Sequence, residues 1–255
     1  MYDALMADTP YDSWAGFIHR IFQKHNLGHG RLSSEKPIVL DLACGTGSIT
    51  LLLDKMGYDM IGVDVSEDML AEAQQKAYEA AQQILFLAQD ARELDLYGTI
   101  DGAVSVCDGL NYILSPVELE KVFQRVFLFM NAGGTFIFDL NTEYKFREML
   151  GDKSFEFDVP SGESYIWDNH YDTESRINEY NMLFYTLDGG QESEVFQELH
   201  RQRAYPVNEV IMMLEQAGFC LDGVYNDYTD TPAKDDSLRV VFVAVKPHEI
   251  RTKIN

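Results

Sequence analysis

A glycine-containing loop follows a short apolar segment in the first fifth of the chain. The apolar run that starts at Pro37 leads into Asp41-Leu-Ala-Cys-Gly-Thr-Gly47, and a helical pattern begins at Ile49. Gly45 and Gly47 have no Cβ, so the backbone can approach a ligand closely there, next to the amide groups of a helix N-terminus. A tight turn that binds no ligand is the alternative, and two glycines alone do not decide between them.

Two later segments place acidic side chains directly after apolar runs. Asp64 ends the run that starts at Tyr58, and an acid at the end of a second strand can accept hydrogen bonds from both hydroxyls of a ribose. Gln89-Asp90-Ala91 follows the next apolar run, where an adenine edge would lie in such a fold. Asp64 could instead cap a helix, although Ser66 already fits that role.

Charge and spacing favour one nucleoside cofactor over another. A dinucleotide fingerprint needs a third glycine, and Thr50 occupies that position. Asp41 precedes the loop, where a carboxylate would repel a pyrophosphate and attract an ammonium group. S-adenosylmethionine has an ammonium and a sulfonium and no phosphate, so it is preferred to NAD. An NAD-dependent oxidoreductase remains the alternative.

The Asp41–Gly47 loop resembles the first motif of class I S-adenosylmethionine-dependent methyltransferases, and the later acids follow at fitting intervals. The resemblance implies that the loop holds the amino-acid part of the cofactor, that Asp64 binds the ribose and that Asp90 binds the adenine amine. It also implies a seven-stranded sheet with an antiparallel last strand. The residues expected at the cofactor are Asp41, Ala43, Gly45, Gly47, Asp64, Val65, Met69, Gln89, Asp90, Ala91 and Cys107.

A bacterial subgroup of that superfamily, whose substrates are mostly unknown, is more similar still. It is matched by Cys107-Asp-Gly-Leu-Asn-Tyr112, Phe136–Asn141 and Glu198–Tyr205. Its members carry an antiparallel insert after the fifth strand and usually have an aromatic-rich stretch before the match to Tyr2–Met6. A shortened N-terminus is therefore an expectation for this chain.

Catalysis demands little beyond alignment of the acceptor with an already activated methyl group, and a base is needed only if the acceptor arrives protonated. Asp108, Asn111 and Tyr112 follow the fourth predicted strand, at the mouth of the site, and are the catalytic candidates. The alternative for Asp108 is a structural turn or a helix cap. An Asn-Pro-Pro-Tyr type motif, used on exocyclic amines of bases, is absent from the sequence.

The elements around these residues alternate between strand and helix, which predicts a parallel sheet with helices on both faces. The predicted class is α/β: a doubly wound, mostly parallel, seven-stranded Rossmann-like sheet with an inserted antiparallel β subdomain. The cofactor domain is expected over 1–151 and 206–247, with an N-terminal helix over 10–26 and a linker from Gly28 to Ser34. Ser115 and Glu118 predict a capping box at the start of a helix.

Residues 152–205 form the predicted insert, a lid or substrate platform. Aromatic and β-branched residues predict strands over 165–171, 177–187 and 195–205, with a hairpin turn at Asp188-Gly189-Gly190 between the last two. The insert has 12 acidic and 4 basic residues, a net charge of −8. The candidate substrate contacts in the whole chain are Tyr11, Trp14, Trp167, His200 and Arg203. Packing is the alternative role for Trp167 and His200, and ion pairing is the alternative for Arg203.

Composition limits the partners. The formal net charge is −22, which disfavours nucleic acid and anionic membranes, and no apolar run approaches the roughly 20 residues of a membrane span. Cys44, Cys107 and Cys220 form neither a disulfide framework nor a metal spacing, so no metal is predicted and a cytoplasmic location is expected. The tail over 248–255 is polar.

The sequence therefore predicts methyl transfer from S-adenosylmethionine to nitrogen or oxygen of a small molecule, with S-adenosylhomocysteine as the product. A tRNA or protein methyltransferase is the alternative within the enzyme class, and a non-catalytic interaction module is the alternative outside it. The acids Asp41, Asp64 and Asp90 argue against a module, because a scaffold needs none of them. The protein is expected to be a monomer or a homodimer.

Overall fold

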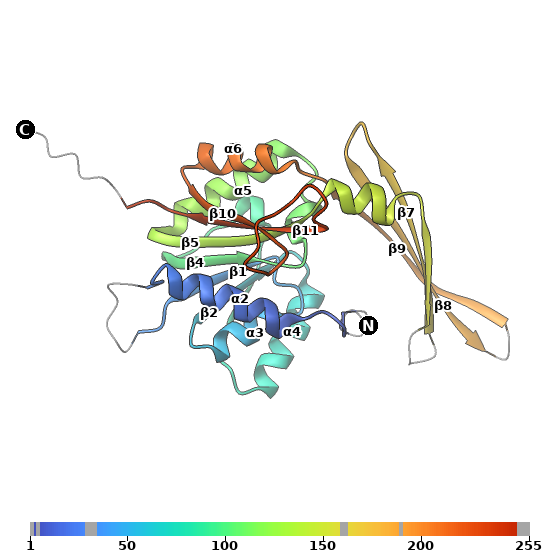
Figure 1. Ribbon diagram of the computed structural model, residues 1–255. Helices are drawn as coiled ribbons and strands as arrows, with labels where there is room; N and C mark the ends of the chain where they lie inside the picture. Colours follow the sequence, from blue (N-terminus) through green and yellow to red (C-terminus); the bar gives the residue numbers. More distant parts are fainter. Residues whose placement is uncertain (1–2, 4–5, 29–34, 159–162, 189–190, 249–255) are drawn as a thin grey trace, which may run out of the picture.

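The computed structural model describes residues 3, 6–28, 35–158, 163–188 and 191–248. It contains two sheets (Figure 1). Most of the linker expected before Glu35, the two glycines of the turn expected at Asp188-Gly189-Gly190 and nearly all of the expected tail lie outside the described residues.

The first part of the chain alternates strands and helices as predicted. Its elements are α2 (Tyr11–Lys24), β1 (Ile38–Leu42), α3 (Ser48–Lys55), β2 (Asp59–Asp64), α4 (Glu67–Glu79), β3 (Leu85–Ala88), η1 (Ala91–Glu93), β4 (Ile100–Ser105), η2 (Gly109–Tyr112), α5 (Pro116–Phe129) and β5 (Met130–Asn141). After the insert follow α6 (Val207–Ala217), β10 (Cys220–Asn226) and β11 (Arg239–Val245).

The larger sheet has seven strands in the order β10-β11-β5-β4-β1-β2-β3. Strands β1 to β5 are parallel, whereas β11 pairs antiparallel with β5 and with β10. The predicted doubly wound, mostly parallel, seven-stranded sheet is therefore confirmed. In such a sheet the carboxyl ends of the parallel strands lie along one edge, which is where ligands bind.

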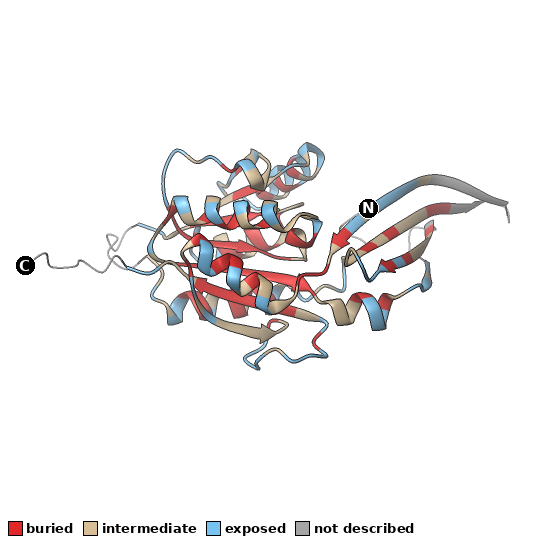
Figure 2. Ribbon diagram, turned by 90° about the horizontal axis from the view of Figure 1, so that it is seen from above, coloured by how far each residue is buried: buried red, intermediate tan, exposed pale blue. Residues whose placement is uncertain are grey.

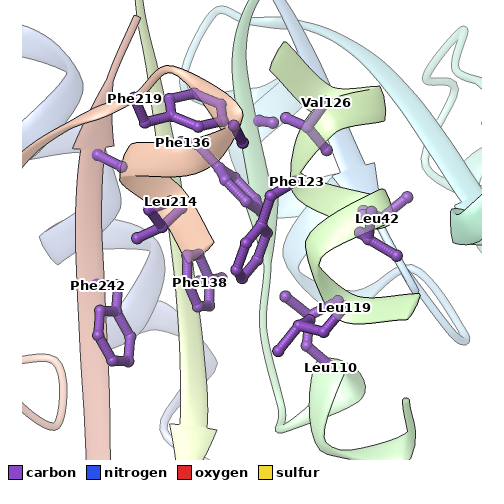
Figure 3. Close-up of a cluster of buried hydrophobic side chains, with 14 of the residues drawn as sticks. Leu42, Leu110, Leu119, Phe123, Val126, Phe136, Phe138, Leu214, Phe219 and Phe242 are labelled. Atoms are coloured by element: carbon purple, nitrogen blue, oxygen red, sulfur yellow. The ribbon is translucent and has the colours of Figure 1, made fainter. Parts of the chain in front are cut away.

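Helices cover both faces of this sheet. The apolar face of α2 packs with Ile49 and Leu53 of α3 on one side, and α5 packs with α6 on the other. Figure 3 shows Phe123 of α5 against the sheet residues Phe136 and Phe138, with Leu214 of α6 beside them. This two-sided burial explains the near-continuous apolar runs of the central strands.

The insert is a separate four-stranded antiparallel sheet. It consists of β6 (Ser154–Asp158), β7 (Glu163–Asp172), β8 (Ile177–Asp188) and β9 (Gln191–Arg203), in sequential order. The prediction of three strands was incomplete, because it did not include β6, although polar and apolar residues alternate over Ser154–Asp158. The short helix η3 (Lys145–Leu150), which connects β5 to the insert, was also missed. Figure 2 shows that buried residues concentrate in the larger sheet and its helices, while the insert is more exposed.

The capping box predicted at the start of α5 is absent. Ser115 is at the N-cap position, but its side chain makes no capping hydrogen bond. The Glu118 carboxylate instead accepts a hydrogen bond from Arg92 at 3.2 Å. An ion pair with η1 has therefore replaced the local interaction. At α4 the expected cap is present, because the Ser66 hydroxyl accepts from the amide of Met69.

Candidate active site

The loop after β1 has the backbone conformation that glycine permits. Gly45 and Gly47 have φ values of +53° and +77°, a region that residues with a Cβ rarely adopt. A Cβ on Gly47 would lie 3.0 Å from side-chain atoms of Leu51 and Ala73. Ala43 also has a positive φ, of 59°. The loop is therefore held in a strained conformation at the carboxyl edge of the sheet, beside the N-terminus of α3.

Asp41 is a fully buried acid beneath this loop. The Thr50 hydroxyl donates to its Oδ2 at 2.6 Å, while its Oδ1 is buried and has no hydrogen-bond partner among the described residues. Burial raises the pKa of Asp41 to about 7, and the nearby negative charge of Asp64 adds to the effect. A buried carboxylate with one free oxygen gains stability from a cationic ligand.

Asp64 ties the end of β2 to the glycine loop. Its Oδ2 accepts from the amide of Gly45 at 2.8 Å and its Oδ1 from the amide of Ser66 at 2.9 Å. Each carboxylate oxygen can accept two hydrogen bonds, so both oxygens retain capacity for a ligand hydroxyl. Met69 lies beside the loop, with its sulfur 3.6 Å from the position that a Cβ on Gly45 would occupy. Val65, the residue after Asp64, is exposed.

Asp90 is more heavily engaged than the sequence suggests. Its carboxylate forms an ion pair with the Arg92 side chain and accepts from the Arg92 amide, which caps η1. The hydrogen bond from Arg92 holds the pKa of Asp90 below its usual value, although burial opposes it. Gln89 closes a local ring of hydrogen bonds with the backbone of Asp95, and Ala91, the first residue of η1, packs against the core.

The turn after the fourth strand contains two consecutive residues with left-handed backbone conformation. Cys107 and Asp108 have φ values of +58° and +53°, which is unusual for residues with side chains. The Cys107 thiol lies 3.8 Å from the Tyr11 hydroxyl, and burial raises its pKa to about 12. The Asp108 carboxylate accepts from Arg239 Nη2 at 3.0 Å and from Gln202 Nε2 at 2.6 Å. Asp108 therefore joins the two sheets.

Arg239 is the centre of a buried charge cluster that the sequence did not indicate. It forms ion pairs with Asp108 and with the fully buried Asp139, and its guanidinium lies 5.0 Å from the ring centre of Trp14. Burial raises the pKa of Asp139, and Arg239 opposes that shift. The cluster fixes the end of β4, because Asp139 also accepts from the Asp108 amide at 2.8 Å.

Lys145, which the sequence did not indicate either, begins η3 beside this cluster. Its Nζ donates to Asn141 Oδ1 at 2.8 Å. Burial lowers its pKa, although the negative charge of Asp108 opposes the shift. Lys145, Asp139 and Arg239 lie far from the glycine motif in the sequence. The pairing of β11 with β5 brings Arg239 to Asp139, and Lys145 follows β5 in the chain.

The other two catalytic candidates occupy different environments. Asn111 is fully buried, and its side chain bonds the backbone of Asn141 and the carbonyl of Arg203. This arrangement makes Asn111 a connector between η2, β5 and β9. Tyr112 is 46% exposed, and its hydroxyl lies 3.4 Å from His200 Nδ1.

Trp14, one of the expected substrate contacts, is enclosed by the fold. It is buried, stacks on Tyr228 with ring centres 4.6 Å apart, and packs under Arg239. The helical spacing that made Trp14 conspicuous is the spacing of the buried face of α2. Tyr11, one turn earlier, is half-buried and packs edge-on against Trp14.

The insert candidates have separate surroundings. Trp167 belongs to an aromatic cluster with Phe155 and Tyr180. His200 contacts the Tyr112 hydroxyl through Nδ1, and Glu198 Oε2 lies 2.9 Å from His200 Nε2. Arg203 donates to the carbonyl of Leu114 at 3.3 Å, and its guanidinium lies over the Tyr205 ring. These contacts give the Arg203 side chain a packing role.

Several known proteins are similar in sequence to this chain, including the residues around this site. Residues 39–134 match the family described as Methyltransferase domain. "Putative methyltransferase YqeM" of Bacillus subtilis (strain 168) is 36% identical over 251 residues, which cover 98% of this chain and 96% of that protein. With the sheet order and the glycine loop, these matches show that the chain belongs to the class I S-adenosylmethionine-dependent methyltransferases.

Two further proteins extend the likeness. "Putative methyltransferase GWCH70_2453" of Geobacillus sp. (strain WCH70) is 34% identical over 96% of each chain. The crystal structure of an S-adenosylmethionine-dependent methyltransferase from Clostridium acetobutylicum ATCC 824 superposes with a TM-score of 0.85. It is 28% identical, with 97% of this chain and 96% of that chain covered. The similarity therefore includes the insert.

S-adenosylmethionine is the cofactor of this family, and the residues present fit it. The free Oδ1 of buried Asp41 lies beneath the glycine loop, where an ammonium group would complete its hydrogen bonding. Asp64, whose two oxygens each accept one backbone amide, would accept hydrogen bonds from the ribose hydroxyls. The bound cofactor supplies a methyl group activated by a sulfonium. The protein supplies position and charge around it.

Proposed function

We propose that this methyltransferase acts on nitrogen or oxygen of a small molecule held between the larger sheet and the insert. The observation that carries this proposal is the hydrogen bond from Gln202 of β9 to Asp108 at the end of β4. It fixes one end of the insert beside the carboxyl edge of the sheet, where the cofactor residues lie. The insert is then a wall of the acceptor site, and strand residues of a wall of this kind set substrate choice.

The similar folds support a small acceptor. The structures that resemble this chain include the sugar N-methyltransferase KedS8 from Streptoalloteichus, with a TM-score of 0.77 and 18% identity, over 97% of this chain and 93% of that chain. The net charge of −22 disfavours a nucleic-acid substrate. No helix among the described residues is long and apolar enough to cross a membrane. The three cysteines are free, which agrees with the cytoplasmic location that we include in the proposal.

Calorimetric titration with S-adenosylmethionine and S-adenosylhomocysteine tests the cofactor site, with Asp64→Ala alongside. We expect micromolar binding, about −8 kcal/mol, that is lost in Asp64→Ala and kept in Asp59→Ala, an exposed acid at the start of the same strand. Amines, acids and tRNA are then screened as methyl acceptors, and release of S-adenosylhomocysteine is measured as the signal of turnover. Turnover of tRNA in place of small molecules would overturn the substrate class.

A further inference from the structure

A chain of three side chains joins η2 to β9 at the solvent-accessible edge of the site. The Tyr112 hydroxyl lies 3.4 Å from His200 Nδ1, and His200 Nε2 lies 2.9 Å from Glu198 Oε2. The two rings meet edge-on, with centres 5.9 Å apart and an angle of 78° between the planes. The phenol, imidazole and carboxylate thus form one connected path.

The carboxylate decides which imidazole nitrogen is basic. An ionised Glu198 only accepts hydrogen bonds, so neutral His200 carries its proton on Nε2. In that tautomer Nδ1 has a lone pair that can accept a hydrogen bond from the Tyr112 hydroxyl, 3.4 Å away. This is the arrangement in which a histidine takes a proton on one nitrogen while an acid stabilises the resulting cation from the other side.

Anchoring of the insert does not explain this arrangement. Gln202, the next residue on the same face of β9, already bonds Asp108, and Asn111 already bonds the carbonyl of Arg203. The three members of the chain are also partly open to solvent, with side-chain exposures of 32% for His200 and 47% for Glu198. A proton acceptor needs such a route to water, whereas a structural clamp does not.

We propose that Tyr112, His200 and Glu198 form a proton relay that removes the proton lost by the methyl acceptor. The acceptor's N–H or O–H bond breaks and its proton passes to Tyr112 Oη. The proton of Tyr112 passes at the same time to His200 Nδ1. The electron pair of the broken bond stays on the acceptor atom, and the imidazolium, held by Glu198, later releases its proton to water. This inference rests on the proposed function and assigns Tyr112 as the catalytic residue, with His200 and Glu198 acting through it.

The groups around His200 are consistent with this role. Tyr180 is its cross-strand neighbour on β8, and the Tyr180 hydroxyl donates to Gln202 Oε1, away from the relay. Asp108, the other nearby acid, is held by Arg239. Among the described residues, Glu198 is therefore the one carboxylate that is hydrogen-bonded to His200. The acceptor class that needs a relay is an ammonium or a hydroxyl, because a carboxylate arrives already deprotonated.

Nitrogen NMR of the full chain with bound S-adenosylhomocysteine tests the relay without an acceptor. We expect neutral His200 to be protonated on Nε2 in the native protein and to lose that preference in Glu198→Gln. His170→Gln is the matched control, since His170 lies on the same sheet and contacts Asp152 at 2.8 Å, with both side chains exposed. A native His200 protonated on Nδ1, or one indifferent to Glu198→Gln, would overturn the relay.

Turnover with an acceptor found in the screen gives the second test. Removal of a general base costs on the order of 100-fold or more in kcat, so we expect that loss in His200→Gln and Tyr112→Phe, and less than twofold in His170→Gln. Calorimetry with S-adenosylhomocysteine separates the outcomes. Unchanged binding together with unchanged kcat in His200→Gln rejects the relay and leaves the methyltransferase function intact, whereas absent binding in the native protein rejects the function itself.

Discussion

Gln202 Nε2 donates to Asp108 Oδ2 at 2.6 Å, and this bond connects residues that are 94 positions apart. Asp108 lies in the turn between β4 of the larger sheet and η2, and Gln202 belongs to β9 of the insert. The side-chain oxygen of Gln202, Oε1, accepts from the Tyr180 hydroxyl at 2.7 Å and from the Asn141 side-chain amide at 3.2 Å. A single buried amide therefore holds the junction between the cofactor edge and the insert, and its satisfied hydrogen bonds make the junction specific.

Replacement of Gln202 by Ala is expected to destabilise the protein by about 2–4 kcal/mol, because it leaves several buried polar groups without partners. Urea unfolding measures the change. Gln197→Ala, at an exposed position on the same strand, is the control and is expected to fall within about 0.5 kcal/mol of the native chain. Equal stabilities of the two variants would show that the junction does not depend on Gln202.

The affinity for S-adenosylhomocysteine is expected to rise with pH through the pKa of Asp41, about 7. In the unfolded chain the pKa of an Asp carboxyl is about 3.9, below the value in the folded protein. Asp41 therefore contributes to folding stability most fully at pH values below the unfolded pKa, and this contribution is lost as the pH rises through 7. Ligand binding has the opposite sign, because the ammonium group favours the ionised acid. Calorimetry at pH 6 and pH 7.5 should show affinity on the order of tenfold higher at the upper pH.

Asp41→Asn is the control for that measurement. An amide at this position has no proton to lose, so the variant should bind weakly with the same affinity at both pH values. A pH dependence that persists in Asp41→Asn would assign the effect to another group.

Gly47→Ala is expected to weaken both folding and cofactor binding. The positive φ of +77° costs about 1–2 kcal/mol for a residue with a Cβ, and the new methyl would press against Leu51 and Ala73. Gly57→Ala separates the two effects, because Gly57 also has a positive φ but has nothing within 4 Å of the added Cβ. Thermal unfolding and calorimetry should show a stability loss in both variants and a binding loss only in Gly47→Ala.

Trp14→Ala tests whether Trp14 is a core residue. Loss of a buried aromatic side chain costs about 3–5 kcal/mol, and here it also removes the ring beneath Arg239. Tyr78→Ala, at a side chain that is 82% exposed, should be nearly neutral. A Trp14→Ala variant of native stability that turns over an acceptor poorly would restore the substrate role.

The elements of the cofactor domain could be predicted because their signals are local. The run before Asp41 is apolar without alternation, which is typical of a strand buried on both faces. Ser66 gives a helix start through one side-chain bond to an amide three residues away. Asp64 and the glycines could be named because strand ends fix their place at one edge of the sheet.

The polar partners of the site could not be predicted, since they depend on side chains that meet across the fold. Glu118 follows the capping rule in sequence, yet it pairs with Arg92 of η1. Asp90 fits the adenine position by its interval, yet Arg92 holds its carboxylate. In both cases a long cationic side chain from another element competes with the local bond.

The sequence by itself determined the fold class, the cofactor and the residues of the glycine loop, because each depends on short-range pattern and on strand order. The tertiary structure alone decided what surrounds Asp108. The antiparallel pairing of β11 with β5 brings Arg239 beside Asp139, and the return of β9 brings Gln202 to the same acid. Contacts between residues so far apart arise from sheet register and packing, and no local pattern in the chain encodes them.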